Sequence, residues 1–591
     1  MISQILIVMI AAIAVTVYAE RRGIQAPLLL ALVGLGASFI PGLPRLELEP
    51  EIILTVVLPP LLFAAAREFS FVSFIRRLGS IVNLGVFLVA VTTGIVGAVA
   101  AAVVPGMTLA VALVLGAVVS PPDAVTAVAI GRKLNLPGAM MTVLKGESLI
   151  NDAAALTFFT FAVASVAGTH LFISNIVLYL LYAAVAGFVL GLVLGAIVHL
   201  VRMRITNATL ATVLTVVVPF AAYLLAEELG ASGVLAVVAA GLSLGHTASA
   251  TQYDARIQEQ QFWRTTDGLL EAFVFAYIGL QFRWVIAEAE DKGFDILELF
   301  GLSAVVLLAV IVVRIGWVFL TALFSRWRDK AAARRVAQID QYMAMSAAEQ
   351  VAKLKSIARP DQRRPGNPQR LQTMRERNAR RLEQMREARK QGAFDLMPPF
   401  TWRENIVISW TGMRGVVTLA AAAGIPLVTA AGEPFPGRDV IQVVAFTVTI
   451  GTLLLQGLTL PWLIAWLGIA DARGEAVRKQ QHKVAEDLVQ EATVAAVTEF
   501  RDKQPAGKGR EMADQMLKRV SLMPAMQAEQ QELYEGTMSE LADLILAARR
   551  EAVVRARDER RLDDEVMREV LEEMDFEQAS MEGRKPEQSG R

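Results

Sequence analysis

The sequence predicts an all-helical protein that crosses a membrane many times. Of its 591 residues, 54% are hydrophobic, and the mean hydropathy is +0.47. Long apolar runs follow one another along the first 470 residues. Soluble globular chains have a lower apolar fraction, so we expect most of this chain to face lipid or other membrane helices.

Segments of the length needed to cross a bilayer recur along the chain. A transmembrane helix needs about 20 mainly apolar residues to cross about 30 Å of hydrocarbon, and about thirteen segments meet this requirement. The predicted spans are 2–18, 24–41, 51–66, 80–103, 107–130, 139–168, 172–201, 208–229, 231–247, 263–286, 296–325, 404–430 and 439–468.

Basic residues gather on alternate loops between these spans, which predicts the orientation. Arg21 and Arg22 follow the first apolar run, and later pairs such as Arg132 and Lys133 fall on the same side. Because cytoplasmic loops are enriched in Lys and Arg, the N-terminus is predicted outside and the C-terminus in the cytoplasm of a bacterial inner membrane. No basic segment precedes the first run, so we interpret it as a retained span and not a signal peptide.

Charge is distributed unevenly, and this predicts the domain organisation. Residues 1–470 form the predicted membrane domain, and residues 471–591 a helical cytoplasmic tail. A basic insertion at 326–403 carries nineteen Lys and Arg against eight acids. The insertion is either a solvated cytoplasmic segment or one that contacts anionic lipid headgroups.

Composition argues against several classes of function. The chain has no cysteine, and its four histidines (His170, His199, His246 and His482) have no metal-ligand spacing. No phosphate-binding loop or nucleophile motif is present. We therefore expect no enzyme activity, no cofactor and no nucleic-acid partner.

We single out four ionisable residues within segments predicted to be inside the membrane. The acids are Asp123, Glu147 and Asp152, and a cation, Arg414, lies in a late span. A charge at the centre of a bilayer costs several kcal/mol, about 3 on insertion scales, so each such residue needs a partner or a function. Asp123 and Asp152 could be inert core acids, but two of them beside a helix break favour a functional site.

Two spans contain residues that interrupt helices. Pro121 and Pro122 remove two backbone donors, so the helix around them should break beside Asp123. Gly412 and Gly415 predict a second, weaker break. Broken backbone at membrane depth is tolerated where it lines a cavity, and breaks in two halves of a chain indicate the inverted repeats of a secondary transporter.

Helical spacing separates the polar residues of the span 139–168 into two faces. Ser148 and Asp152 are four residues apart and share one face, which could point toward Asp123. Glu147 and Asn151 share the adjacent face. We interpret Glu147 as the partner of Arg414 in a buried structural ion pair, with a direct role in transport as the alternative.

Three segments of the chain resemble signatures of a known family. SPPDAVTAVAI, GESLIND and WTGMRGVVTLA are similar, in that order, to motifs of the cation:proton antiporter superfamily, and especially to its electroneutral sodium/proton exchangers, called NhaP-type in bacteria. The resemblance covers about residues 1–470. It implies a homodimer in which a core domain with crossed, discontinuous helices moves against a dimer domain.

The resemblance also implies roles for individual residues. Asp152 would be the shared proton and cation site, with Asp123 as a more distant or water-mediated ligand of Na⁺. Many relatives have threonine where this chain has Pro122, so only the backbone oxygen there can serve as a ligand. Asn151 fits the branch with one asparagine and one aspartate and would support the site, to which helical spacing adds Ser148. Glu147 and Arg414 would form the stabilising pair.

The predicted function is exchange of a monovalent cation for H⁺. Na⁺ is the expected ion and K⁺ the alternative, with one cation exchanged for one proton by alternating access. A desolvated Asp152 carboxylate would bind either ion but not both. A cation channel is disfavoured because the chain has no filter-like repeat, and a membrane sensor that signals through the tail is a further alternative.

Overall fold

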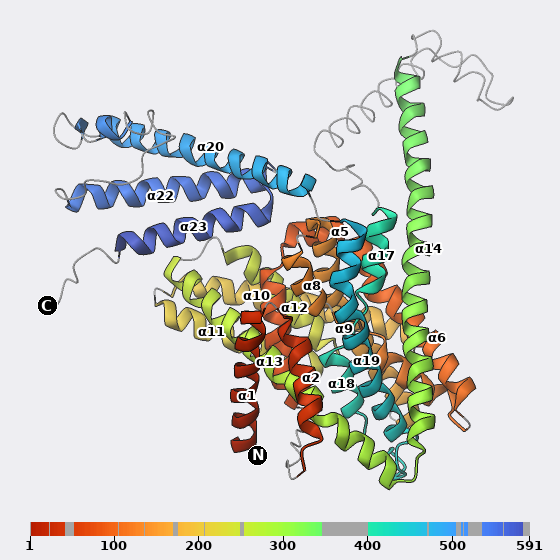
Figure 1. The fold of residues 1–591 in the computed structure, drawn as a ribbon. Helices are drawn as coiled ribbons and strands as arrows, with labels where there is room; N and C mark the ends of the chain where they lie inside the picture. The colour runs from red at the N-terminus through yellow and green to blue at the C-terminus, as the bar shows by residue number, and fades with distance from the viewer. Residues whose placement is uncertain are drawn as a thin grey trace. The chain divides into compact units, whose positions relative to one another are not determined.

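The structure is a computed structural model that describes most of the chain as helices and loops. It describes residues 2–22, 24–41, 52–104, 106–123, 125–134, 136–168, 175–205, 207–248, 253–344, 400–469, 472–503, 510–511, 513–517, 535–559 and 561–582. Within these ranges no strand is present, and an isolated β-bridge joins Val428 and Pro434. The prediction of an all-helical fold is confirmed (Figure 1).

The chain divides into two units. One contains Met1–Arg314 and Val407–Arg591, and the other contains Ile315–Ile406. The first unit holds the site described below and also the described tail helices, so the predicted boundary at 470 falls inside it. The basic insertion predicted at 326–403 lies wholly within the second unit, and its residues 345–399 lie outside the described part of the chain.

Helices occupy every range predicted as a span. In the first half they are α1 (Ile2–Arg22), α2 (Ala26–Ser38), the π-helix η1 (Ile53–Val57), α4 (Leu58–Glu68), α5 (Phe71–Val82), the π-helix η2 (Asn83–Phe87), α6 (Leu88–Val103), α7 (Leu109–Val119), α8 (Val125–Lys133), α9 (Gly138–Ala167) and α10 (Ile176–Arg202). They continue with α11 (Ala208–Glu228), α12 (Gly233–Thr247), α13 (Tyr253–Asp291), α14 (Ile296–Ala344), α17 (Trp402–Trp410), α18 (Val416–Ala423) and α19 (Arg438–Leu467).

Eight helices among the described residues are long and apolar enough to cross a membrane. The helices Ala26–Ser38, Leu109–Val119 and Gly233–Thr247 are apolar but shorter. Several helices extend beyond the predicted spans. The span predicted at 263–286 is part of a helix of 39 residues, α13, which begins ten residues earlier, at Tyr253, so Arg256 also lies on this helix.

Helix ends follow the local sequence. The side chains of Thr108, Asn175, Asn207 and Ser232 accept backbone N–H groups in the first turns of α7, α10, α11 and α12. They satisfy donors that have no partner within the helix. At its other end α9 stops at Gly168, whose φ of 73° is a conformation that glycine adopts without strain.

The helix α9 joins two apolar cores. Its residues Leu149, Ile150 and Ala153 pack in a core built from α4, α5 and α10–α13. Its later residues Phe159 and Ala162 pack in a second core, built with α7, α14, α18 and α19. The polar residues of α9 therefore lie on a helix that is fixed by two different groups of neighbours.

The tail contains three long helices that pack together. They are α20 (Ala472–Lys503), α22 (Glu535–Asp558) and α23 (Asp564–Glu582), and they run side by side in Figure 1. Their apolar core includes Ala485, Leu546, Val553, Leu571 and Met574. The tail is thus a folded helical module in the part that the structure describes.

Candidate functional site

The first interruption separates α7 from α8. The helix α7 ends at Val119 and α8 begins at Val125, so Pro121 and Pro122 lie between the two helices. The loss of backbone donors is partly compensated at once, because the Ser120 hydroxyl donates to the Ala117 carbonyl at 2.9 Å. The break lies where the two prolines predict it.

The second interruption separates α17 from α18. The helix α17 ends at Trp410 and α18 begins at Val416, and the five residues between them, 411–415, have no helical structure. This stretch contains the predicted glycines, Gly412 and Gly415. It is held by α19, since the Arg414 backbone N–H donates to Thr452 Oγ1 at 2.9 Å.

The two interrupted stretches contact each other directly. The backbone N–H of Asp123 donates to the Met413 carbonyl at 2.6 Å. In return, Arg414 Nη1 donates to the Ser120 carbonyl at 2.6 Å. A Cβ atom at Gly415 would overlap the Asp123 carboxylate, so only glycine allows this close approach. Each broken helix therefore satisfies backbone groups of the other.

Asn151 and Asp123 hold the start of α8. Asn151 Nδ2 donates to the Pro122 carbonyl at 2.6 Å, and the Asn151 side chain is fully buried. Asp123 Oδ1 accepts the Val125 backbone N–H at 2.8 Å, which caps the first turn of α8. Asp123 also lines the cavity described next.

Asp123 and Asp152 line one cavity. It has a volume of about 230 Å³, and Ser148, Gly415 and Thr418 also line it. The Asp152 side chain belongs to α9 and is only 8% exposed, whereas Asp123 is partly buried. Two carboxylates that share one small cavity repel each other when both are ionised. Such a pair favours a bound cation or proton between the two acids.

Three further acids line the same cavity, namely Glu68, Asp267 and Glu271, and the sequence analysis missed them. Asp267 and Glu271 lie four residues apart on α13, so they share one face of this helix. With Asp123 and Asp152 they concentrate negative charge around one cavity. The signal for Asp267 and Glu271 was present in the sequence, because both acids interrupt the apolar run predicted as a span at 263–286.

The sequence predicted an ion pair between Glu147 and Arg414, but the cation that pairs with Glu147 is a different residue. Glu147 pairs with Arg314 of α14, with Nη1–Oε1 and Nη2–Oε2 distances of 2.5 and 3.1 Å. Arg314 Nε also donates to the Ile408 carbonyl at 3.2 Å. Both side chains of the pair are nearly inaccessible to solvent. The sequence signal that was missed is Arg314 itself, a lone cation in the middle of the apolar span predicted at 296–325. A cation in such a position requires a partner.

Arg414 has a different partner because of where its helix breaks. The stretch 411–415 crosses the C-terminal end of α7, and the guanidinium of Arg414 binds the Ser120 carbonyl there. A cation at this end of a helix complements the partial negative charge of its free carbonyls. Arg414 therefore stabilises the contact between the two interruptions.

The chain is similar to known membrane transporters. The family model described as "Sodium/hydrogen exchanger, transmembrane" matches residues 6–351 and 390–466. An uncharacterized Na⁺/H⁺ exchanger of Mycobacterium tuberculosis is 27% identical over 590 residues, which cover 98% of this chain and 96% of that relative. A sodium, potassium, lithium and rubidium/H⁺ antiporter of Bacillus pumilus is 27% identical over 451 residues, with coverage of 74% and 57%.

A solved structure has the same fold. The sodium proton antiporter MjNhaP1 from Methanocaldococcus jannaschii at pH 8 superimposes with a TM-score of 0.54 at 18% sequence identity. The superposition covers 80% of this chain and 98% of that one.

Proposed function

Since the chain belongs to the sodium/hydrogen exchanger family and is a monovalent cation/proton antiporter, we propose that Na⁺ and H⁺ compete for one site at Asp152 and Asp123. The observation that carries this proposal is the cavity shared by the two carboxylates, one of them nearly buried. The relative from Bacillus pumilus is named for four alkali cations, so K⁺ is the alternative to Na⁺.

The ligands of the cation follow from the groups around the cavity. Both carboxylates and the Ser148 hydroxyl offer oxygen atoms, which suit a hard monovalent ion. Pro121 and not Pro122 is among the residues that line the cavity, and the Pro122 carbonyl already accepts a hydrogen bond from Asn151. Its second lone pair remains the backbone ligand that we propose. Asn151 thus supports the site by fixing this carbonyl.

Competition at Asp152 explains obligatory exchange. An ionised carboxylate is costly to move through a region without water, so Asp152 must first be neutralised. A proton or a cation can neutralise it, but binding of one removes the charge that attracts the other. If the site changes sides only when neutral, one cation is exchanged for one proton, which is electroneutral.

The remaining features of the proposal concern the whole transporter. We propose about thirteen membrane crossings, arranged as inverted repeats whose broken helices, α7–α8 and α17–α18, cross at the site. A core domain that carries the site would move against a dimer domain in a homodimer. The N-terminus would lie outside the bacterial plasma membrane and the C-terminus inside, with the 326–403 segment near anionic lipid.

The experiment is exchange by the purified protein in proteoliposomes, with internal pH followed after addition of Na⁺, K⁺ or Li⁺. Asp152→Asn should reduce cation-dependent proton flux to the level of empty vesicles, because the amide can hold neither ion as a counter-charge. Asp291→Asn, which removes an exposed acid at the end of α13, should leave the flux unchanged. Retained Na⁺-dependent flux in folded Asp152→Asn protein would refute the proposal.

A further inference from the structure

The tail helix α23 is docked on the membrane domain through a buried ion pair. Asp575 accepts hydrogen bonds from Arg256 Nε at 2.7 Å and from Arg256 Nη2, and it also accepts one from Arg550 of α22 at 2.7 Å. Both Asp575 and Arg256 are buried. Nearer the solvent, Arg264 lies 3.4 Å from Glu572. Two arginines of α13 therefore hold one face of α23.

A second anchor joins α23 to the end of α4. The guanidinium of Arg568 donates to three successive backbone carbonyls, those of Arg67, Glu68 and Phe69, at 3.4, 2.7 and 3.2 Å. The last carbonyls of a helix have no partner within it, and they carry partial negative charge. A residue 500 positions later in the chain thus caps α4, which places α23 firmly at this helix end.

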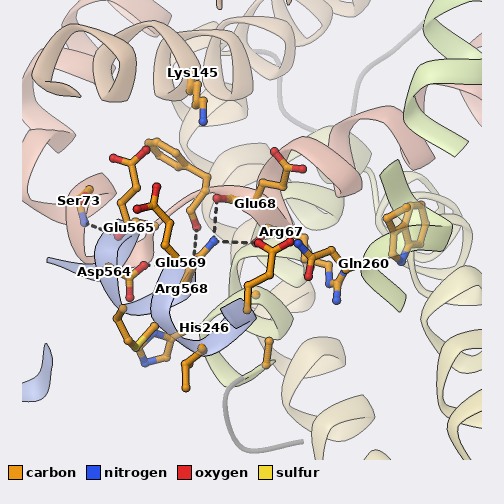
Figure 2. A pocket seen from close by; sticks show the side chains of 18 of the residues that line it. Arg67, Glu68, Ser73, Lys145, His246, Gln260, Asp564, Glu565, Arg568 and Glu569 are labelled. Atoms are coloured by element: carbon orange, nitrogen blue, oxygen red, sulfur yellow. Dashed lines mark hydrogen bonds and ion pairs between the residues drawn. The ribbon is translucent and has the colours of Figure 1, made fainter. Parts of the chain in front are cut away.

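Between α23 and the membrane domain lies a cavity of about 550 Å³, shown in Figure 2. Lys145 of α9 and Glu68 of α4 face it from the membrane domain, and Glu565 and Glu569 of α23 face it from the tail. This cavity adjoins the one that contains Asp123 and Asp152. The two share four lining residues, namely Glu68, Arg132, Lys145 and Asp267. The outer cavity is therefore the vestibule of the ion site on the side of the tail.

The charges of the vestibule come in two opposing sets. From the membrane domain, the described lining residues include five cations and two acids: Arg67, Arg132, Lys145, Arg256 and Arg264, with Glu68 and Asp267. From the tail they include two cations and five acids: Arg557 and Arg568, with Asp564, Glu565, Glu569, Glu572 and Asp575. The membrane domain thus supplies a surplus of three positive charges, and the tail supplies an equal negative surplus.

The positive charges of the membrane domain are unfavourable at the entrance of a protein that transports cations. Basic residues at the cytoplasmic ends of helices fix the topology, but the same residues repel cations from the entrance. We propose that α23 resolves this conflict by forming the outer wall of the vestibule and cancelling its positive charge, so that cytoplasmic cations reach the ion site. The inference rests on the proposed function, and it gives the tail a direct part in transport.

The test uses everted membrane vesicles of the full-length protein, which present the cytoplasmic face to added Na⁺. The triple variant E565Q/E569Q/E572Q removes three tail acids that line the vestibule. At an ionic strength of about 0.01 M, where the screening length is about 30 Å, we expect the KM for Na⁺ to rise about three- to tenfold. The maximal rate should be unchanged, because none of these acids touches the ion site.

Salt dependence distinguishes electrostatic attraction from a structural effect. At about 1 M ionic strength, set with a salt of a bulky organic cation, charges more than about 3 Å apart are screened, and the KM of the variant should approach that of the wild type. Adding Arg264→Gln to the triple variant removes one positive charge from the same vestibule, so it should restore part of the low-salt affinity.

A matched control and a milder variant keep the result interpretable. The triple variant E486Q/D487N/E491Q removes three exposed acids of α20 that do not line the vestibule, so its KM should equal that of the wild type. If the first triple variant does not fold, Glu565→Gln alone, on an exposed side chain, should raise the KM about twofold.

Three outcomes would overturn the inference. An unchanged KM in the folded triple variant, or a fall in maximal rate with no change in KM, would show that α23 does not attract cations. An equal rise in the α20 control would assign the effect to total charge. By contrast, a wild-type protein without cation-dependent proton flux would overturn the proposed function itself, and the inference with it.

Discussion

The two interrupted helices meet at one point, yet they break for different reasons. The stretch 120–124 contains Pro121 and Pro122, which cannot donate hydrogen bonds, so the break is imposed by its own backbone. The stretch 411–415 contains no proline. Its glycines leave room for neighbours instead, because a Cβ at Gly412 would lie 2.6 Å from Arg314 Cδ and one at Gly415 would overlap Asp123.

The two stretches have different roles at the site. The proline-containing stretch brings the carboxylate of Asp123 to the cavity, while the glycine-containing stretch brings a guanidinium, that of Arg414, to the end of α7. The position of Asp123 is set by the prolines beside it in the sequence, whereas the position of Arg414 depends on the residues packed around its stretch. Substitutions around the second stretch should therefore damage folding or geometry most, whereas those around the first should act mainly on the site.

The largest effect is expected at the cation packed against Gly412. Arg314→Ala leaves Glu147 as a buried charge without its partner, which should cost about 3–5 kcal/mol of stability. Arg414→Ala should cost less, about 1–3 kcal/mol, because it leaves only the Ser120 carbonyl unpaired. Thermal unfolding in detergent measures both. The exchanged pair E147R/R314E should recover part of the loss, and equal stability of the two alanine variants would contradict the assignment.

The next effect concerns the contact between the stretches. Gly415→Ala should reduce the exchange rate at least tenfold, about 1.4 kcal/mol, since its methyl group must displace the Asp123 carboxylate. Proton flux in proteoliposomes measures this loss. Gly94→Ala on α6 is the control, because a Cβ there meets no atom within 4 Å. Wild-type exchange in Gly415→Ala would mean that the two breaks do not touch in the working protein.

The smallest effect is expected at the support of the proline-containing stretch. Asn151→Ala removes the donor that holds the Pro122 carbonyl and should cost about 1 kcal/mol, since water in the neighbouring cavity can replace it. We also expect a severalfold rise in the KM for the transported cation, with stability little changed. A loss of stability as large as that of Arg314→Ala would show that Asn151 holds the fold and not the site.

The sequence by itself determined the helical membrane fold and the first break. Apolar runs of spanning length predict helices wherever they occur, and Pro121 with Pro122 removes two adjacent backbone donors, whereas the single prolines Pro219 and Pro461 lie inside continuous helices. Both are local properties, so they could be read without knowing the neighbours. The acids Asp123 and Asp152 were also evident, because charges in apolar runs are unfavourable and stand out.

Only the tertiary structure decided which groups are partners. The chain has two buried cations, Arg314 and Arg414, that could pair with Glu147. The pairing with Arg314 depends on how α9 and α14 pack, and no local sequence pattern predicts this packing. The same holds for Asp267 and Glu271 at the cavity and for Arg568 at the end of α4. Hydropathy and backbone chemistry act within a few residues, whereas a buried charge is satisfied by whichever part of the chain folding brings beside it.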